Sequence, residues 1–325
     1  MGLSRTVSLT QRLSMGGTYI RNRLTGRPTS LTLEITKRCN ATCDFCPYWE
    51  ADEVDEVKDF TPAIRYFQPL HVSITGGEPF LRKDLVDIVK QVKGVPGYRY
   101  IGLYTNGWLL TEAKVEELTQ AGVNQIQISL NYPDERQDTE RGIPGLWKKL
   151  STFLPEMAKK GYDNISIGTF LCAENLDCVA DLARVVAGWG VKQSFNSYSR
   201  LKNDNQSHVL TPEQIEKARR AIEDLIEVKH TNRNSLTSDQ YLRTIPTFFE
   251  EAQRPGCTAG DKFLYIDQQG WVKQCPEMPA IAHITELETQ GVDTQPVSCG
   301  LCWYACRGEH QTKVDLQRLH EFIVT

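Results

Sequence analysis

The 325-residue sequence predicts an α/β fold built on a parallel sheet. Strand-like segments alternate with helical segments over about two hundred residues, which is typical of parallel strands joined by crossover helices. Gly122, Gly161 and Gly190 follow helical stretches at positions where C-caps belong. The strands alternate between polar and apolar residues, which distinguishes this sheet from one covered by helices on both faces.

Six segments are predicted strands, and the five stretches between them are predicted helices. The strands are Leu31–Thr36, Val72–Thr75, Tyr100–Tyr104, Gln125–Leu130, Ile165–Leu171 and Gln193–Tyr198. The helices are Thr61–Phe67, Lys83–Val92, Thr111–Ala121, Gly145–Lys160 and Leu176–Trp189. A further amphipathic stretch opens at Thr211-Pro212-Glu213 and runs toward Val228. Beyond residue 230 the rhythm stops, so we expect a domain of residues 31–230 and a cysteine-rich domain of residues 231–325.

Polar side chains share one face of several predicted strands. Thr32 and Glu34 lie on one face of the first strand, and Gln125, Gln127 and Ser129 on one face of the fourth. A barrel whose interior holds a polar ligand has this pattern, with its apolar side packed under the helices. An antiparallel sheet with one wet face is the alternative, and the intervening helices disfavour it.

Composition excludes two broad classes of protein. The 37 Lys and Arg against 41 Asp and Glu give a net charge of −4, which argues against a general nucleic-acid binder. The mean hydropathy is −0.40 and no apolar run approaches the ~20 residues of a membrane span.

Residues 1–30 form a basic N-terminal extension with five Arg and no acid. The stretch has no apolar core typical of a secretory signal, so we expect a cytoplasmic protein. Met1–Thr6 fits the loose N-myristoylation pattern, which is often false. The extension is interpreted either as a solvated leader helix or as a helix in weak contact with an anionic membrane surface.

Ten cysteines are the most informative feature of the composition. Disulfides are rare in the cytoplasm, so closely spaced cysteines there indicate a metal or an iron–sulfur cluster. Cys39, Cys43 and Cys46 follow the first predicted strand with a CxxxCxxC spacing. Three thiolates leave one iron of a cubane cluster open, whereas a structural zinc site needs a fourth ligand, and none is adjacent.

This motif, with Phe45 before its last cysteine, resembles the signature of the radical SAM superfamily. Further resemblances follow in the family's order: Thr75–Pro79 reads TGGEP, Thr105–Gly107 reads TNG, and Ile128–Asn131 stands where members usually show Ser-x-Asp. Arg141-Gly142 resembles the Arg-Gly of many members. The resemblance implies a partial (β/α)6 barrel that binds S-adenosylmethionine (SAM) at a [4Fe-4S] cluster.

The resemblance also implies roles for single residues. Cys39, Cys43 and Cys46 are expected to hold three irons of the cluster. Six further residues are expected to bind SAM: Gly76, Gly77, Glu78, Ser129, Asn131 and Arg141. The glycines allow close approach of the methionyl group, Glu78 accepts from its amino group, and the remaining three contact ribose or carboxylate. Asn131 departs from the usual Asp. Ser129 and Asn131 could instead be polar residues of the barrel interior, and Arg141 a surface arginine.

The tail carries a second cysteine group, at positions Cys257, Cys275, Cys299, Cys302 and Cys306. Phe263–Cys275 alternates around Gln-Gly and predicts a β-hairpin that returns Cys275 beside Cys257. The tail resembles SPASM/twitch extensions, which implies an auxiliary [4Fe-4S] cluster on four of the five, with Cys302 or Cys306 the uncertain member. Zinc held by four thiolates is the alternative. Cys172 and Cys178 are interpreted as buried apolar residues, with Cys172 alternatively a hydrogen-atom donor in the interior.

The resemblance implies a radical SAM oxidoreductase or transferase. Such an enzyme cleaves SAM reductively to a 5′-deoxyadenosyl radical, which abstracts hydrogen from a substrate. The auxiliary cluster would assist oxidation or bond formation. We expect a polar small-molecule or peptide substrate and a flavodoxin- or ferredoxin-type electron donor. A ribosomal-peptide maturase, a membrane-associated lipid-modifying enzyme and an iron–sulfur electron carrier remain alternatives.

Overall fold

A computed structural model describes residues 9–311, so the Met1–Thr6 pattern lies outside the described residues. In the described chain, one sheet of nine strands has the order β6-β5-β4-β3-β2-β1-β7-β8-β9. The strands are β1 Ser30–Glu34, β2 His71–Thr75, β3 Tyr100–Thr105, β4 Gln125–Ser129, β5 Ile165–Leu171, β6 Lys192–Ser197, β7 Phe263–Ile266, β8 Trp271–Lys273 and β9 Ala280–His283.

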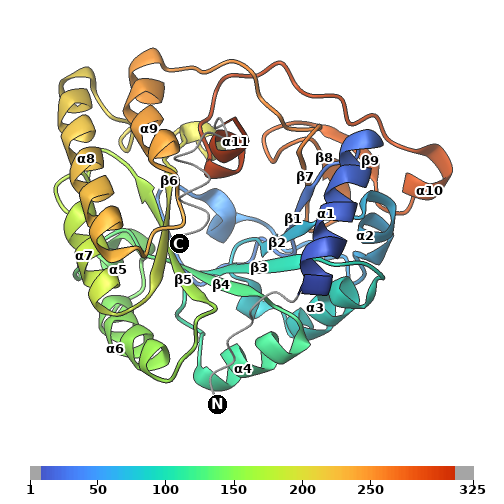
Figure 1. The fold of residues 1–325 in the computed structure, drawn as a ribbon, viewed down its shortest axis with the longest axis horizontal. Helices are drawn as coiled ribbons and strands as arrows, with labels where there is room; N and C mark the ends of the chain where they lie inside the picture. The colour runs from blue at the N-terminus through green and yellow to red at the C-terminus, as the bar shows by residue number, and fades with distance from the viewer. Residues whose placement is uncertain (1–8, 312–325) are drawn as a thin grey trace.

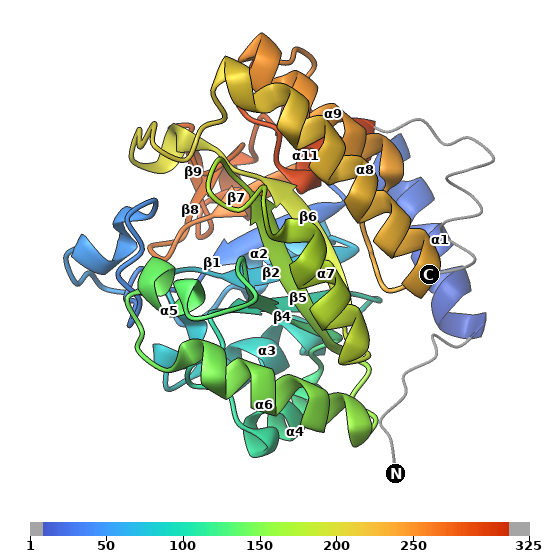
Figure 2. The ribbon, with the colours of Figure 1, turned by 90° about the vertical axis from the view of Figure 1, so that its left-hand side faces the viewer.

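Helices connect these strands and lie on the outside of the curved sheet, as Figures 1 and 2 show for α3, α4, α6 and α7. The α-helices are α1 Leu9–Leu24, α2 Thr61–Phe67, α3 Leu85–Gly94, α4 Glu112–Ala121, α5 Arg136–Arg141, α6 Leu146–Lys159, α7 Val179–Gly188, α8 Ile215–Asn232, α9 Asp239–Glu251, α10 Leu287–Gln290 and α11 Ala305–Gln311. Short 3-10 turns are η1 Pro47–Glu50, η2 Pro79–Leu81, η3 Arg200–Lys202 and η4 Pro212–Gln214.

Strands β1 to β6 are parallel neighbours in sequence order, which confirms the predicted α/β fold. All six predicted strands exist with bounds within two residues, and each of the five predicted helices is present. The predicted amphipathic stretch is η4 followed by α8. Helix α5 was not predicted, because its six polar residues carry no apolar periodicity.

The predicted face alternation follows from how the sheet is packed. The apolar residues of each strand point outward into the main core, where Leu33, Ile74 and Ile128 are fully buried. They pack against apolar residues of the helices, including Ile88 of α3 and Leu150 of α6. The polar residues of each strand therefore face the inner side of the curved sheet.

The tail joins the same sheet rather than forming a separate one. Strand β7 pairs in parallel with β1, with Leu31 opposite Leu264, and β8 and β9 continue antiparallel. The predicted hairpin is β7 and β8. Consequently the tail extends the sheet beside β1, whose end leads into the first cysteine loop. The boundary proposed near residue 230 falls in the last turn of α8.

Candidate active site

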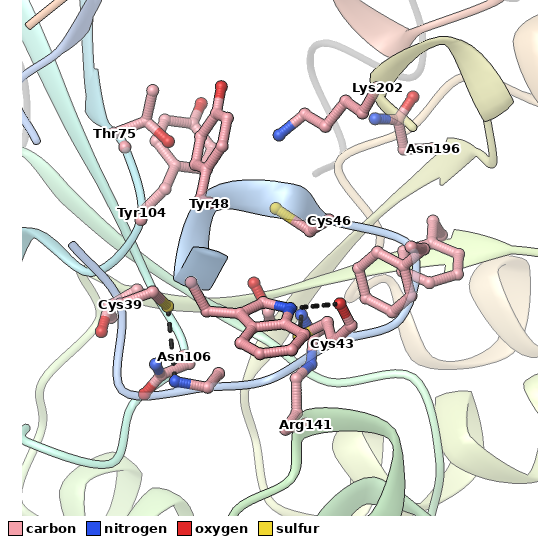
Figure 3. Close-up of a pocket in the computed structure, with 18 of the residues that line it drawn as sticks. Cys39, Cys43, Cys46, Tyr48, Thr75, Tyr104, Asn106, Arg141, Asn196 and Lys202 are labelled. Carbon is pink, nitrogen blue, oxygen red and sulfur yellow. Dashed lines mark hydrogen bonds between the residues drawn. The ribbon is translucent and has the colours of Figure 1, made fainter. Parts of the chain in front are cut away.

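A pocket lies at the carboxyl ends of the parallel strands, where loops from β1 to β6 converge (Figure 3). Its walls come from the Cys39–Cys46 loop, the strand ends and the tail. The lining residues are Cys39, Ala41, Cys43, Phe45, Cys46, Tyr48, Trp49, Thr75, Gly76, Gly77, Tyr104, Thr105, Asn106, Ser129, Arg141, Phe170, Asn196, Ser197, Tyr198, Ser199, Lys202 and Tyr304. Parallel α/β sheets characteristically bind ligands at this edge.

The three cysteines of the first motif all face this pocket and are free thiols. The loop curls so that the backbone N–H of Ala41 donates to Cys39 Sγ at 3.4 Å. Trp49 Nε1 donates to the carbonyl of Cys43 at 3.2 Å, which fixes the turn after the motif. Burial raises the pKa of Cys39 to about 11, so the thiol must lose its proton when it binds a metal.

The Gly76-Gly77 turn after β2 is packed directly against the cysteine loop. The N–H of Gly77 donates to the Thr36 carbonyl at 2.8 Å, and the N–H of Glu78 to that of Arg38 at 2.8 Å. A Cβ on Gly76 would lie 2.2 Å from the Thr36 oxygen, and one on Gly77 2.3 Å from the Arg38 oxygen. The glycines are therefore required by contact with protein backbone, a reason that differs from the expected approach of a ligand.

Glu78 is fully buried, and its carboxylate is occupied by protein donors. It accepts from Thr105 Oγ1 at 2.8 and 3.0 Å, from the N–H of Asn106 at 2.8 Å and from that of Phe80 at 3.1 Å. Glu78 thus holds the end of β3 in place, so that Thr105 and Asn106 reach the pocket wall. Glu78 itself is not among the pocket-lining residues of the described chain.

Arg141 is buried beside the cysteine loop rather than exposed, which excludes its interpretation as a surface arginine. Its Nη1 lies 3.7 Å from Cys43 Sγ, and its guanidinium lies over the ring of Phe45. Its Nε lies 3.2 Å from Glu140 Oε2. The charge of Arg141 is therefore shared between a thiol and a buried carboxylate.

Ser129 and Asn131 lie in different environments in the structure. Ser129 lines the pocket at the end of β4. The carboxamide of Asn131 is fully buried and is bonded within the protein instead: its Nδ2 donates to both oxygens of Glu140 at 2.9 and 2.8 Å, and its Oδ1 accepts from the N–H of Phe170. Asn131 thus orients Glu140, which in turn orients Arg141.

A buried carboxylate joins the cysteine loop to the tail. Glu34 of β1 is 1% exposed and accepts from the hydroxyls of both Tyr48 and Tyr265. Tyr48 follows Cys46 by two residues and lines the pocket, whereas Tyr265 belongs to β7. Burial, together with the charge of Glu34, raises the pKa of Tyr48, so the hydroxyl stays protonated and donates.

Four of the five tail cysteines interact electrostatically with one another. Burial raises the pKa of Cys275 to about 12, and the thiols of Cys302 and Cys257 add to the rise. Cys306 interacts in the same way with Cys302, Cys257 and Cys275. Among the described residues, Cys299 is not one of the thiols that act most strongly on this group.

The spacing of the thiols limits how they could share one metal ion in this conformation. Thiolates bound to one zinc ion at about 2.3 Å lie within about 4 Å of each other. In the described part of the chain, neither cysteine group contains three thiols within 4.8 Å of one another. A cubane cluster sets each thiolate on a different iron and thus farther apart, so the spacing of the residues present is compatible with an iron–sulfur cluster.

Several pocket residues were not predicted from the sequence. Tyr48 and Trp49 come from η1, Asn196 and Lys202 from the end of β6 and the following turn, and Tyr304 from the tail. The polar run after β6 carried a usable signal, because the end of a sixth parallel strand must meet the same edge as the others. The remaining pair of cysteines, Cys172 and Cys178, is buried as expected, and neither is among the described residues that line the pocket.

The fold and the pocket define a parallel α/β protein with three free thiols on a loop at the carboxyl ends of its strands. Residues 33–186 match the family described as the Radical SAM superfamily. Residues 33–186 thus form a radical SAM domain, which confirms the resemblance for this part of the chain.

Relatives agree with this family. A GTP 3′,8-cyclase of Pelotomaculum thermopropionicum is 31% identical over 137 residues, 38% of this chain and 42% of that protein. An AdoMet-dependent heme synthase of Methanosarcina barkeri is 23% identical over 282 residues, 80% of each. The chain thus spans less than half of the cyclase that it matches.

Solved structures show the same fold. Streptococcus suis SuiB, bound to its precursor peptide SuiA, has a TM-score of 0.60 at 18% identity, and the match covers 88% of this chain and 65% of that chain. The SuiB structure bound to S-adenosylmethionine also has a TM-score of 0.60, at 18% identity, with 79% of this chain and 64% of that chain covered. Within residues 9–311, no helix is long and apolar enough to cross a membrane.

Proposed function

We propose that this protein is a radical SAM enzyme that binds SAM at a [4Fe-4S] cluster on Cys39, Cys43 and Cys46 and carries an auxiliary [4Fe-4S] cluster on the tail. The observation that carries the proposal is the convergence of the three thiols and the strand ends of the radical SAM domain on one pocket. When bound, SAM and the reduced cluster supply a 5′-deoxyadenosyl radical that takes a hydrogen atom from the substrate.

The chain's own residues bind, orient and enclose the reactants. Ser129, Thr105 and Asn106 offer polar groups to a bound SAM from the ends of β4 and β3. Gly76 and Gly77 fix the cysteine loop against β2, and Glu78 fixes the end of β3. Arg141 places a positive charge beside Cys43, which favours the thiolate that a cluster requires.

We assign the auxiliary cluster to Cys257, Cys275, Cys302 and Cys306, and leave Cys299 outside it. This assignment is supported by the mutual electrostatic interaction of the four thiols. Tyr304 stands between Cys302 and Cys306 in the sequence and lines the pocket. A cluster held by these cysteines would lie near the pocket wall at Tyr304, where it would take up an electron from the substrate.

The substrate end of the pocket is polar and favours a polar small molecule or a peptide. Asn196, Ser199, Lys202 and Tyr304 line the pocket. Figure 3 shows Asn196 and Lys202 together, on the side of the pocket away from Cys39. SuiB, which shares the fold, has been solved with a precursor peptide, and this makes a peptide one of the two substrate classes. The electron donor is proposed to be a flavodoxin or ferredoxin of the cytoplasm, where ten free thiols stay reduced.

Weak contact of residues 1–30 with an anionic membrane surface also stays a proposal, and exposed side chains of α1 support it. Tyr19, Ile20 and Leu24 are 51%, 59% and 82% exposed, and Arg21 and Arg23 lie among them. Apolar and basic side chains together are typical of helices that lie in a bilayer interface. Co-sedimentation with phosphatidylglycerol vesicles, compared with phosphatidylcholine vesicles, tests this contact.

The central test is SAM cleavage by the anaerobically reconstituted protein with dithionite as reductant. We expect 5′-deoxyadenosine from the wild-type protein and none from Cys39→Ala, Cys43→Ala or Cys46→Ala. The matched control is Cys178→Ala, a buried cysteine outside both groups, which is expected to retain cleavage. A protein that holds its clusters and binds SAM but never yields 5′-deoxyadenosine, even with candidate substrates, would instead be an electron carrier.

A further inference from the structure

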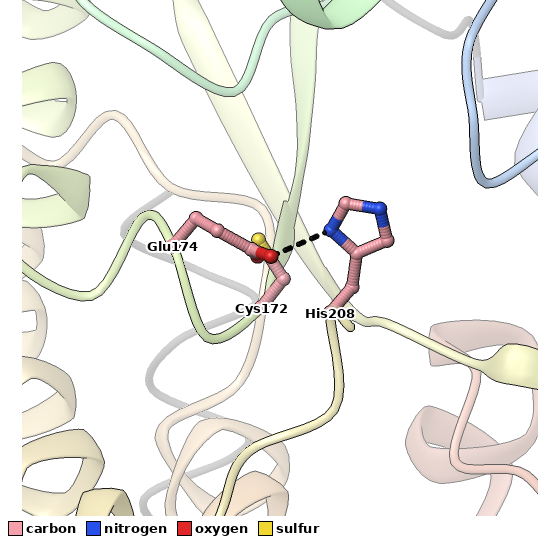
Figure 4. Close-up of side chains that lie close together, drawn as sticks. All are labelled: Cys172, Glu174 and His208. Atoms are coloured by element: carbon pink, nitrogen blue, oxygen red, sulfur yellow. Dashed lines mark ion pairs between the residues drawn. The ribbon is translucent and has the colours of Figure 1, made fainter. Parts of the chain in front are cut away.

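A third group of metal-binding side chains lies outside the pocket and outside both cysteine motifs. Cys172, Glu174 and His208 bring one ligand atom each to within 4.8 Å of the other two (Figure 4). Glu174 Oε1 lies 2.9 Å from His208 Nδ1. Cys172 is 1% exposed, whereas the side chain of Glu174 is 39% exposed, so the group is open to solvent on one side.

The backbone around this group is held in place by hydrogen bonds. The buried carboxamide of Asn175 accepts from the N–H of Cys172 at 3.1 Å and donates to the carbonyl of Phe170 at 2.7 Å. The N–H of Ala173 donates to the carbonyl of His208 at 3.1 Å. Two loops far apart in the sequence are thus fastened together at the point where the three side chains meet.

The second nitrogen of His208 points to another carboxylate. His208 Nε2 lies 3.1 Å from both oxygens of Asp44, and the ring packs edge-on against Phe45 and Tyr198. Histidines that bind metals commonly donate their second N–H to a carboxylate, which fixes the ring and its tautomer. With its proton on Nε2, His208 presents the lone pair of Nδ1 toward Glu174 and Cys172.

That arrangement needs a positive charge among the three side chains. A carboxylate oxygen and a nitrogen lone pair repel each other at 2.9 Å unless a proton or a cation lies between them. A proton on Nδ1, in addition to the one on Nε2, satisfies the carboxylates of Glu174 and Asp44 but does not involve the thiol of Cys172. A metal ion engages the buried thiol as well, and thiolate, imidazole and carboxylate together are ligands typical of zinc.

We propose that Cys172, Glu174 and His208 bind one Zn²⁺ ion, with Asp44 as the carboxylate that orients His208. The fourth position of the zinc is left to water, on the exposed side of Glu174. Binding releases the proton of the Cys172 thiol to solvent. Because Asp44 lies between Cys43 and Cys46, the zinc site is joined to the cysteine loop through the contact of His208 with Asp44.

The test measures zinc and iron in the anaerobically reconstituted protein after incubation with a small excess of zinc sulfate and gel filtration. We expect about one zinc per chain, with Zn K-edge absorption that shows one sulfur and three nitrogen or oxygen neighbours. Cys172→Ser and Glu174→Gln are expected to lose this zinc while the iron content stays unchanged. The control Cys178→Ser, which alters a buried cysteine of the same segment, is expected to keep it.

The variant Asp44→Asn provides a second test, which measures the affinity for zinc. This affinity would not change if Asp44 formed only a structural ion pair with His208. We expect it to retain the zinc but to bind it about 10- to 100-fold more weakly in competition with a chromophoric chelator. Three results would overturn the proposal: no zinc on the iron-loaded protein, a zinc shell of three or four sulfurs, or full zinc retention by both Cys172→Ser and Glu174→Gln. The first and last leave SAM cleavage untouched, so this proposal and the proposed function fail separately.

Discussion

Arg141 Nη1 lies 3.7 Å from the sulfur of Cys43, while Arg141 Nε lies 3.2 Å from the carboxylate of Glu140. Burial raises the pKa of Cys43, and the guanidinium opposes the rise. A cluster bound to Cys43 therefore has a fixed positive charge and a fixed negative charge close to it. The net charge around an iron–sulfur cluster is one of the factors that set its reduction potential.

Arg141→Met is expected to lower the reduction potential of the cluster on Cys39, Cys43 and Cys46, because the positive charge that favours the reduced form is gone. Glu140→Gln is expected to raise it, and the double variant to fall between the two. Potentiometric titration followed by electron paramagnetic resonance measures all three. Arg141→Met also leaves Glu140 buried without its cation, at a cost of about 3–5 kcal/mol in stability. Shifts of the same sign in both single variants would contradict the assignment.

Gly77→Ala is expected to damage the cysteine loop without touching a cysteine. Its Cβ would meet the carbonyl oxygens of Arg38 and Lys37 at 2.3 and 2.5 Å, and backbone must move to make room. We expect a loss of about 1–3 kcal/mol in unfolding free energy and a lower iron content after reconstitution. Gly188→Ala is the control, because its Cβ meets nothing within 4 Å and a helical alanine adds about 0.5–1 kcal/mol. Normal iron content in Gly77→Ala would show that the loop can shift without cost.

The sheet and the first cysteine loop could be predicted from the sequence, because both depend on local sequence patterns. The alternation in β4 and the spacing of Cys39, Cys43 and Cys46 need no knowledge of distant contacts. The chain of contacts in which Asn131 orients Glu140 and Glu140 orients Arg141 was not predicted. It depends on how α5 packs next to the end of β4. The pairing of β7 with β1 was missed for a similar reason: more than two hundred residues separate the strands, and no periodicity encodes such a contact.

Tyr265→Phe is expected to weaken the joint between the tail and the radical SAM domain. It removes one of two hydroxyls that donate to Glu34, which is buried and ionisable. A buried acceptor that loses a donor costs about 1–3 kcal/mol, measurable as a lower denaturant midpoint. Tyr19→Phe is the matched control, because its ring is 51% exposed, and it is expected to unfold like the wild type. Equal midpoints for Tyr265→Phe and Tyr19→Phe would mean that water replaces the lost donor.

Cys275→Ser and Cys299→Ser are expected to differ although both alter a tail cysteine. The four thiols assigned to the auxiliary cluster include Cys275 and exclude Cys299. Iron analysis is expected to give about eight irons for the wild type and Cys299→Ser, and about four for Cys275→Ser. Cys275→Ser should still cleave SAM, because the first cluster is intact. If Cys299→Ser loses four irons, the assignment of ligands is wrong.

Asp239 is expected to make the joint between α8 and α9 sensitive to acid. Its carboxylate is 1% exposed and lies 2.6 Å from both Lys229 Nζ and His230 Nε2. Burial raises the pKa of Asp239, but the hydrogen bonds and charges of Lys229 and His230 outweigh it and leave the pKa below its ordinary value of 3.8.

Because the folded-state pKa is lowered, the stabilising contribution of Asp239 is present above pH 3.8 and is lost as the pH falls through the folded-state value. At pH 7 we expect Asp239→Asn to cost about 3–5 kcal/mol, since Lys229 stays buried without its anion. The difference between wild type and Asp239→Asn should shrink steadily below about pH 4. Urea unfolding of both proteins at matched pH measures this difference in unfolding free energy, and loss of acid-labile clusters affects the two proteins alike.

Glu223→Gln is the control. It breaks an exposed pair with Arg243 and is expected to cost at most about 1 kcal/mol. A difference between wild type and Asp239→Asn that stays constant down to pH 2 would show that Asp239 is not ionised in the folded protein.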